Sequence, residues 1–290
     1  MHWRISRFTI DLTAPKVMGI VNVTPDSFSD GGTHGSRDAA KAHCDRLLKD
    51  GADILDIGGE STRPGALELP VEEELERVLP IVRHAVTLGV PVSVDTYKPQ
   101  VMQAVLDLGA DIINDVWALQ WRAGAIGTSA IDVVRQHPSC GVCLMHMHRN
   151  PQTMQVAPME GDVVPQVLLF LERSAQYLQG LGVDKARICI DPGIGFGKTV
   201  QQNFTLLAQQ TALVPLGYAV LAGWSRKSSL AAVTGRSLAA VATLDIRDRL
   251  VPSVTAALLA VQNGAHVVRV HDVKETVQAL KVLSAMQQSR

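Results

Sequence analysis

Short apolar runs alternate along the chain with longer segments in which apolar side chains recur every three or four positions. Apolar runs of this length predict buried parallel strands, and the 3.6-residue period predicts helices between them. The expected strands are residues 17–21, 53–57, 91–95, 111–116, 141–146, 187–191, 216–222 and 266–271. The expected helices are residues 36–50, 71–88, 99–108, 131–136, 163–179, 203–208, 228–263 with a break near Pro252, and 273–287.

Eight strand–helix units in 290 residues predict an α/β chain folded as a (β/α)₈ TIM barrel. We expect a single domain, with a short strand segment or lid in residues 1–15 and the barrel in residues 16–290. The turns 51–55, 109–113 and 264–268 resemble one another: a glycine ends a helix and a strand starts two residues later. A doubly wound open sheet is the structural alternative.

Composition narrows the classes of function. The net charge of −1 gives no general attraction to nucleic acid or to an anionic membrane. The first residues lack the apolar core of a signal peptide, and no apolar run approaches ~18 residues. The four cysteines are scattered, and the Cys140–Cys143 pair lies at a predicted strand rather than at a helix start, which argues against redox or zinc chemistry. We expect a cytoplasmic protein with reduced thiols.

Polar side chains stand at nearly every strand end, where a barrel carries its active site. Carboxylates and carboxamides predominate on the middle strands, and cations on the last two. The set is Asn22, Asp56, Asp95, Asn114, Asp115, His146, Asp191, Arg226, Lys227, Arg269 and His271. The carboxylate group suits a heterocycle with several N–H donors on one edge, and the cationic group suits a phosphate or diphosphate. The alternative is that these groups pair with one another as structural salt bridges.

Three loops carry further chemistry. The first, after Asn22, is long, bears glycines and holds an isolated Phe28, which is typical of an active-site edge. A second, rich in glycine and hydrogen-bonding groups, follows residue 57. The glycine-rich loop 193–199 is no Walker A loop, because Pro192 holds the required first glycine position. It is better interpreted as a loop that lets backbone approach a flat ligand.

His146 and His148 form an H-x-H pair, which places two imidazoles on one face of a strand. A metal hydrolase uses such a pair, but the sequence has no second histidine cluster or bridging lysine at matching strand ends. We therefore expect that neither histidine binds a metal.

The sequence resembles the dihydropteroate synthases over residues 5–285. The matching motifs are MGIVNVTPDSFSDGG (18–32), DIGGESTRPG (56–65), SVDTYKP (93–99), IINDV (112–116), CLMHMHRNPQTMQ (143–155), DPGIGFGK (191–198), SRKS (225–228) and RVHDVKE (269–275). The resemblance implies a (β/α)₈ transferase of folate biosynthesis and a target of sulfonamides. Such an enzyme joins p-aminobenzoate to 6-hydroxymethyl-7,8-dihydropterin diphosphate, giving 7,8-dihydropteroate and pyrophosphate by a dissociative, Mg²⁺-assisted substitution.

Motif positions then imply the roles of individual residues. The pterin pocket is implied to contain Asp95, Asn114, Asp191 and Lys227. The diphosphate site is implied to contain Asn22, Thr62, Arg269 and His271, with Asn22 helping to hold Mg²⁺. The p-aminobenzoate pocket is implied to contain Phe28, Arg63, Pro64, Phe196, Lys227 and Ser228, and Asp30 is implied to order the first loop. The catalytic group is implied to be Asp95, Asp191, Lys227, Arg269 and His271.

The chain departs from the family pattern at His148, Arg149, Trp224 and Pro252, none of which is an implied contact. Two rival functions stay open at this stage. A methyltransferase-type pterin barrel would keep the carboxylates but would not need an anion site. A non-catalytic homologue would bind pterin without turnover. The implied partners are the two small substrates and a second copy of the chain in a homodimer, with no nucleic acid or membrane.

Overall fold

The computed structural model describes residues 1–24, 32–61, 66–121, 128–235 and 246–289. Eight parallel strands form a closed barrel in the order β10-β3-β4-β5-β6-β7-β8-β9. Because β10 pairs with both β9 and β3, the sheet has no open edge, which excludes the doubly wound alternative. The strands are β3 (Lys16–Asn22), β4 (Ile54–Gly58), β5 (Val92–Asp95), β6 (Ile112–Asp115), β7 (Gly141–Met145), β8 (Ile188–Asp191), β9 (Ala219–Ala222) and β10 (Val267–Val270).

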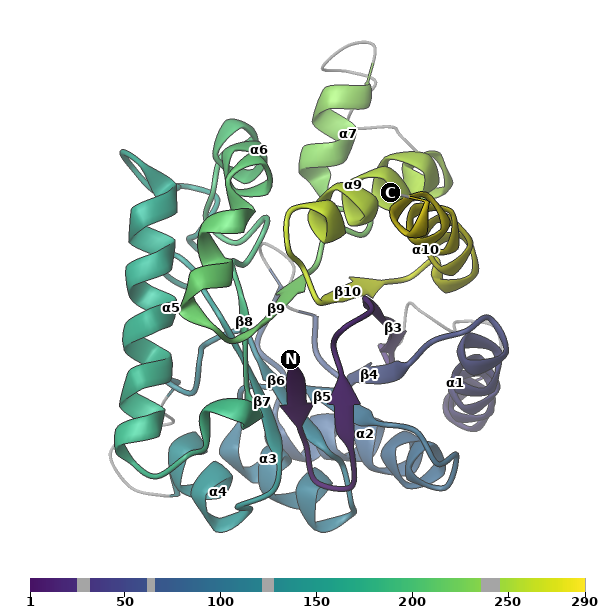
Figure 1. The fold of residues 1–290 in the computed structure, drawn as a ribbon. Coiled ribbons are helices and arrows are strands. Elements are labelled where there is room, and N and C mark those ends of the chain that lie inside the picture. Colours follow the sequence, from purple (N-terminus) through teal and green to yellow (C-terminus); the bar gives the residue numbers. More distant parts are fainter. Residues whose placement is uncertain (25–31, 62–65, 122–127, 236–245, 290) are drawn as a thin grey trace.

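Helices surround this barrel, and the amino-terminal hairpin crosses its near end (Figure 1). The α-helices in the described residues are α1 (Gly32–Lys49), α2 (Val71–Val86), α3 (Pro99–Asp107), α4 (Ala130–Gln136), α5 (Val163–Gly180), α6 (Val200–Ala208), α7 (Ser228–Thr234), α9 (Leu250–Gln262) and α10 (Val273–Gln288). Short 3₁₀ segments are η2 (Lys185–Arg187), η3 (Gln210–Leu216) and η4 (Ile246–Arg249). In the part of the chain that the structure describes, no helix is both long and apolar enough to cross a membrane.

Local chemistry explains several element boundaries. Helix α4 begins with a capping box, in which the Ser129 hydroxyl accepts from the Asp132 N–H and the Asp132 carboxylate accepts from the Ser129 N–H. The three repeated turns begin at Gly51, Gly109 and Gly264, with φ of 99°, 99° and 93°. Glycine is the residue that adopts this left-handed backbone at little steric cost, so the repeat is a backbone requirement.

The N-terminal segment forms the predicted strand pair, β1 (His2–Arg4) and β2 (Thr9–Asp11), which are antiparallel. Its buried side chains join an apolar cluster with residues from the strands of the barrel. The cluster contains Trp3, Ile5, Ile10, Leu12, Met18, Ile54, Ile112, Cys143, Cys189, Ala219, Leu221 and Val267. The hairpin therefore covers the amino end of the barrel, where these side chains would otherwise be exposed to water.

Several predicted boundaries were wrong, including the start of α6, which lies at Val200 and not at residue 203. Helix α1 begins at Gly32, before the cap predicted at residue 36. The predicted strand at 216–222 begins only at Ala219, because Leu216 ends a 3₁₀ segment and Gly217 is left-handed at φ 72°. The helical stretch predicted at 228–263 contains α7, which ends at Thr234, and α9, which begins at Leu250 near the predicted break. Pro252 lies in the first turn of α9, where its missing N–H has no helical acceptor.

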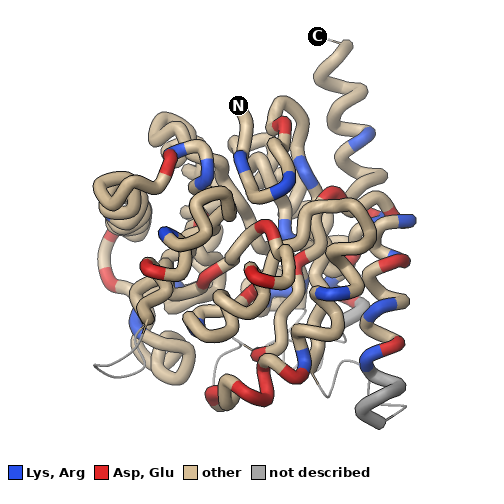
Figure 2. Tube along the Cα trace, turned by 90° about the horizontal axis from the view of Figure 1, so that it is seen from below, with Lys and Arg blue, Asp and Glu red and all other residues tan. Residues whose placement is uncertain are grey.

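Charged residues of both signs are distributed along the chain (Figure 2). This distribution agrees with the net charge of −1.

Candidate active site

Three polar side chains from neighbouring strands meet at the carboxyl ends of β4, β5 and β6. Asp56 is fully buried and accepts from the Ser93 hydroxyl at 2.6 Å. The Asn114 carboxamide donates to both oxygens of Asp56 at 3.4 Å. Asp95 is the direct register partner of Asn114 on the next strand. Parallel register thus places these acceptors on one side of the barrel mouth, as the pattern of strand ends predicted.

Arg269 reaches these carboxylates from the last strand. Its Nε donates to Asp56 at 2.6 Å and its Nη2 donates to Asp95 at 2.7 Å. Since β10 neighbours β3 and not β4 or β5, the side chain must cross the barrel interior to make both contacts. The proposed separation of carboxylates from cations is therefore wrong for this residue, because barrel closure brings β10 back beside the first strands. The salt-bridge alternative describes this part of the site.

Two geometric features leave part of the Arg269 guanidinium available to a ligand. The pairs use only Nε and one Nη group, so Nη1 has no hydrogen bond to any group in the described ranges. The side chain is 22% exposed. Arg269 can therefore hold the two carboxylates and still present N–H groups to an anion.

The pKa of Asp95 is raised to about 7, because burial and the neighbouring Asp56 carboxylate together outweigh the lowering effect of Arg269. Burial also raises the pKa of Asp191, against the lowering effect of its hydrogen bond from the Gly193 N–H, which is 2.7 Å long and ends on Oδ1. The Oδ2 atom of Asp191 accepts no hydrogen bond from the described residues. Desolvated carboxylates with acceptor capacity left over are suited to a ligand that donates N–H groups.

Lys198 holds the glycine-rich loop after β8 through hydrogen bonds from its buried side chain. Its ammonium is 2% exposed and donates to the carbonyls of Gly193 and Phe196 and to Nδ1 of His146, at 2.8, 3.1 and 2.9 Å. Burial lowers the pKa of Lys198 to about 7 and that of His146 to about 3. A Cβ at Gly193 would lie 1.9 Å from the His146 carbonyl oxygen, so only glycine fits there.

Lys227 lies above this loop at the start of α7. Its Nζ is 4.3 Å from the centroid of the Phe196 ring, a cation–π distance. The adjacent Arg226 is left-handed at φ 59° and pairs with Asp272 at 2.6 Å, so its guanidinium is held by that ion pair. Of the two cations predicted after β9, only Lys227 therefore approaches the glycine-rich loop.

His271 follows β10 and is bonded twice to Ser225. Its backbone N–H donates to the Ser225 Oγ at 3.1 Å, and its Nδ1 lies 3.0 Å from the same oxygen. When Ser225 donates its hydroxyl proton to Nδ1, Nε2 of the imidazole carries the N–H and can donate to a ligand.

Other predicted residues are placed as follows. Asn22 ends β3 and is half-buried, and its carboxamide makes no hydrogen bond within the described residues. Ser228 is exposed at the first position of α7. Phe28, Asp30, Thr62, Arg63 and Pro64 lie outside the described residues.

Asp56 is the buried counter-ion of Arg269, a role that the sequence did not predict, although Asp56 was expected at a strand end. It also missed the ion-pair triad of Lys98 with Glu60 and Glu74, whose distances are 2.5 and 2.8 Å. The signal was present in the motif GGESTRPG, because Glu60 stands at the root of the second loop. A lysine 38 positions away cannot be assigned to it without the fold.

The residues that depart from the family pattern have structural surroundings of their own. Trp224 is buried against Phe204, with ring centroids 5.3 Å apart. Arg149 adopts a left-handed φ of 64°, and its Nε donates to His148 at 3.3 Å. These contacts lie beside the site, and no ion pair in the described residues links them to Asp95, Asp191 or Arg269.

Comparisons with known proteins identify the family of the chain. The family model described as "Pterin binding enzyme" matches residues 18–271. A dihydropteroate synthase of Neisseria meningitidis serogroup C is 46% identical over 287 residues, which is 98% of this chain and 97% of the relative. The chain belongs to the dihydropteroate synthases.

Solved structures of this family share the whole fold. A Xanthomonas albilineans dihydropteroate synthase with 4-aminobenzoic acid is 48% identical, with 99% of each chain covered and a TM-score of 0.88. A Burkholderia cenocepacia dihydropteroate synthase complexed with 7,8-dihydropteroate is 45% identical, with a TM-score of 0.85 over 99% of this chain and 97% of that one. Dihydropteroate synthases are transferases, so the predicted fold and enzyme class are both confirmed. The methyltransferase-type alternative finds no support among these relatives.

Proposed function

We propose that the chain condenses p-aminobenzoate with 6-hydroxymethyl-7,8-dihydropterin diphosphate at the mouth of the barrel, releasing pyrophosphate. The observation that carries the proposal is the cluster of Asp56, Asp95, Asn114 and Arg269, with Asp191 on the strand opposite. It combines buried acceptors for a pterin with a cation for the leaving group. In the proposed substitution the arylamine attacks the pterin directly and no protein nucleophile is required, so catalysis rests on positioning and electrostatics.

The pterin ring binds between the strand ends in this proposal. The guanidine-like edge of the ring donates to Asp191, whose Oδ2 is open, and its neighbouring positions meet Asn114 and Asp95. Lys227 and the glycine-rich loop border the ring. As the C–O bond to the diphosphate breaks, positive charge spreads into the pterin. Asp95 and Asp191 stabilise that charge when both are ionised.

The leaving diphosphate binds beside Arg269 and His271 in this proposal. Arg269 offers its Nη1 group, and His271 offers the Nε2 proton that its contact with Ser225 favours. Both donors lie at or just after the end of β10. They stabilise the negative charge that collects on the departing oxygen.

The residues fit Mg²⁺ only as an ion shared with the substrate. The described residues contain no group of three or more His, Cys, Asp or Glu that could hold a metal, so an all-protein cage is not available there. Mg²⁺ is commonly bound by one or two protein oxygens together with substrate phosphates and water. The carboxamide of Asn22, which has no hydrogen bond to the described residues, would supply such an oxygen. When bound, the ion supplies positive charge to the diphosphate.

The arylamine pocket is proposed to involve Phe196, Lys227 and Ser228 together with Phe28, Arg63 and Pro64, with Asp30 helping to order the first loop. Asn22 and Thr62 stand at the roots of the two loops that carry the last three contacts. A diphosphate held by Asn22 and Thr62 would couple its own binding free energy to that of p-aminobenzoate. p-Aminobenzoate should therefore bind measurably only when pyrophosphate, Mg²⁺ and pterin are present. Calorimetric titration with and without them decides this, and equal affinity would contradict it.

The assay that tests the proposed function is pyrophosphate release from the pterin diphosphate, measured with each component omitted in turn. Release should require the protein, p-aminobenzoate and Mg²⁺. A methyltransferase-type barrel would release none. A non-catalytic homologue would bind the pterin diphosphate tightly in a calorimeter but leave it intact.

We further propose that the chain works in the cytoplasm as a homodimer. Its four cysteines are buried free thiols, which agrees with a reducing compartment. Large apolar side chains are exposed on the neighbouring helices α9 and α10, including Val251 and Val282 at 73% and 71%. Exposed apolar groups of this size suit a protein interface. Val282→Glu should lower the mass measured by light scattering to that of a monomer.

A further inference from the structure

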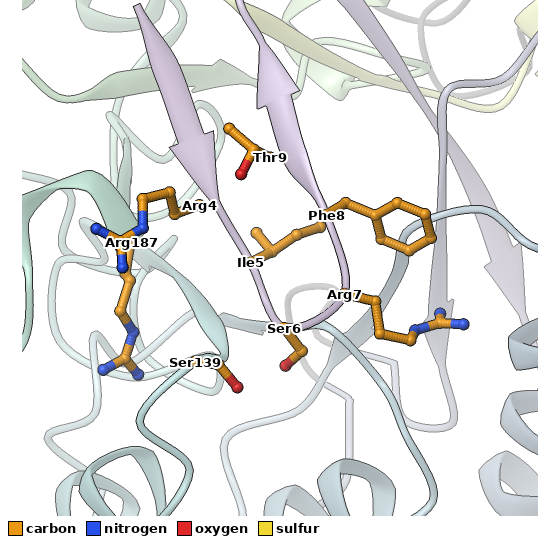
Figure 3. A pocket seen from close by; sticks show the side chains of 8 residues that line it. All are labelled: Arg4, Ile5, Ser6, Arg7, Phe8, Thr9, Ser139 and Arg187. Carbon is orange, nitrogen blue, oxygen red and sulfur yellow. The ribbon is translucent and has the colours of Figure 1, made fainter.

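A pocket of about 270 Å³ lies at the amino end of the barrel, where the apolar floor of the barrel separates it from the active site. The hairpin forms one wall, and Ser139, before β7, and Arg187, at the end of η2, form the other (Figure 3). Its lining residues are Arg4, Ile5, Ser6, Arg7, Phe8, Thr9, Ser139 and Arg187. The lining thus contains three arginines and three hydroxyl groups and no carboxylate.

Arg187 is the unusual member of this set, because its guanidinium is buried without an acidic partner. The residue is 4% exposed, and no ion pair links it to a carboxylate in the described ranges. Its Nε donates to the carbonyl of Cys140 at 2.7 Å, and its Nη2 donates to those of Val134 and His137 at 3.2 and 3.0 Å. Buried arginine is rarely found unpaired, since desolvating a charge is costly.

These bonds account for only part of the side chain. The hydrogen bonds of Nε and Nη2 are explained by capping of the carboxyl end of α4, because cations stabilise the last carbonyls of a helix. The third nitrogen, Nη1, donates to nothing in the described residues, and it is not among their fully enclosed unpaired atoms. The residue lines the pocket, so its small exposed area opens there. The pocket therefore receives a cation whose charge no side chain balances.

The other two arginines leave the net charge of the pocket lining positive. Arg7 is paired with the buried Asp111 through Nε at 2.9 Å and Nη2 at 2.6 Å, and Figure 3 shows it pointing away from Arg187. Arg4 pairs with Asp184 at 2.7 Å through Nη1 alone, which leaves its other N–H groups available. With two of the three arginines neutralised, the lining keeps a net charge of +1.

Two hydroxyl groups complete the donor set. Ser6 lies in the turn between β1 and β2, and Ser139 lies just before β7. Neither hydroxyl has a hydrogen bond to the part of the chain that the structure describes, although both line the pocket. Donors that converge from the hairpin, from the β7 side and from Arg187 match an acceptor with oxygens in several directions. A phosphate group has this shape, whereas a planar carboxylate does not.

We propose that this pocket binds a phosphate group, held by Arg187, Ser6 and Ser139 with Arg4 at the rim. It is a second anion site, on the opposite end of the barrel from the diphosphate site. The volume exceeds that of a single phosphate, so both a free phosphate and a small phosphate ester can enter. By bridging the hairpin and the β7 side, the ligand would hold the hairpin on the barrel.

The test is calorimetric titration of the full chain with inorganic phosphate, comparing the wild type with Ser139→Asp. The new carboxylate should occupy the cation and repel phosphate, and it lies far from the catalytic residues. Gln278→Glu, an exposed change on α10, is the matched control for one added negative charge. Arg187→Met is the direct variant, but it also removes the cap of α4, so Ser139→Asp is the variant that decides.

The wild type and Gln278→Glu should bind phosphate at two sites per chain. Ser139→Asp should keep one of these sites and bind phosphate at the other at least tenfold more weakly. The rate of pyrophosphate release should be equal in all three, which separates this proposal from the proposed function. The same two sites in Ser139→Asp would overturn the proposal, as would acetate that displaces phosphate equally well. Glycerol 3-phosphate as a second probe shows whether the ester binds more tightly than the free ion.

Discussion

At the scale of single residues, Asp191 is the proposed anchor of the pterin. Asp191→Asn replaces an acceptor by a donor that faces ligand N–H groups, which should weaken pterin binding by about 2–3 kcal/mol. Asp107→Asn, an exposed aspartate at the end of α3, is the control and should bind pterin normally. Calorimetry with a pterin that lacks the diphosphate measures both. Wild-type affinity in Asp191→Asn would remove this residue from the pocket.

Asp95 predicts a pH dependence of pterin binding. Its pKa is raised to about 7, so acidification below that value protonates it in the unliganded protein. The ligand donates to the ionised form, so affinity should fall as pH drops. The ionised fraction decreases roughly eightfold between pH 7.5 and 6.0 for a pKa of 7, and affinity should follow it. Asp95→Asn should bind the pterin weakly, with an affinity that does not fall as pH drops. Any pH dependence that remains in this variant measures titration of the ligand. An unchanged acid limb in the variant would assign the effect to another group.

Sequence alone located most of these residues and misjudged how they interact. Asp95, Asn114 and Asp191 were identified because polar groups directly follow apolar strands. The contact of Arg269 with Asp56 and Asp95 could not be derived, because the residues are 213 and 174 positions apart and only closure of the barrel joins them. A list of charges by strand shows their signs but not which pairs face each other.

At the scale of elements, the glycine-rich loop depends on one buried cation. Lys198 bonds the carbonyls of Gly193 and Phe196, and a Lys198→Met change leaves these acceptors without their donor. Each unsatisfied buried group costs about 1–3 kcal/mol, so stability should fall and the loop should no longer hold Phe196 in place. We expect a lower free energy of unfolding in urea together with weaker p-aminobenzoate binding in the presence of pyrophosphate.

Lys185→Met is the matched control, because Lys185 bonds one carbonyl, that of Leu216, from an exposed position. It should change neither quantity by much. Normal substrate binding in a stable Lys198→Met protein would show that the loop is held by its own backbone. The sequence hid this role, since the Gly-Lys-Thr ending suggests a nucleotide loop and the true partners of the lysine are mostly carbonyls.

At the scale of the whole molecule, the hairpin and the barrel share one apolar cluster, and we propose that they unfold together as one domain. Trp3 is fully buried and its indole N–H donates to the Arg187 carbonyl at 2.9 Å. Trp3→Ala should therefore lower the free energy of unfolding by about 3–5 kcal/mol. His2→Ala, exposed on the same strand, should have little effect.

Both variants should unfold in a single transition when the barrel and the hairpin are followed by separate probes. A separate early transition of the hairpin would contradict a single domain. The strand pair was predictable from its sequence, but its position was not, because nothing in residues 1–15 specifies which end of the barrel it covers.

The central claim is that the mouth of this barrel joins an arylamine to a pterin and expels pyrophosphate. The most direct measurement is the amount of 7,8-dihydropteroate, quantified by chromatography and mass spectrometry, against the amount of pyrophosphate released in the same reaction. The account predicts equal amounts, with formation dependent on p-aminobenzoate and strongly reduced in Asp191→Asn. Pyrophosphate released without dihydropteroate, or unreduced product formation by Asp191→Asn, would contradict it.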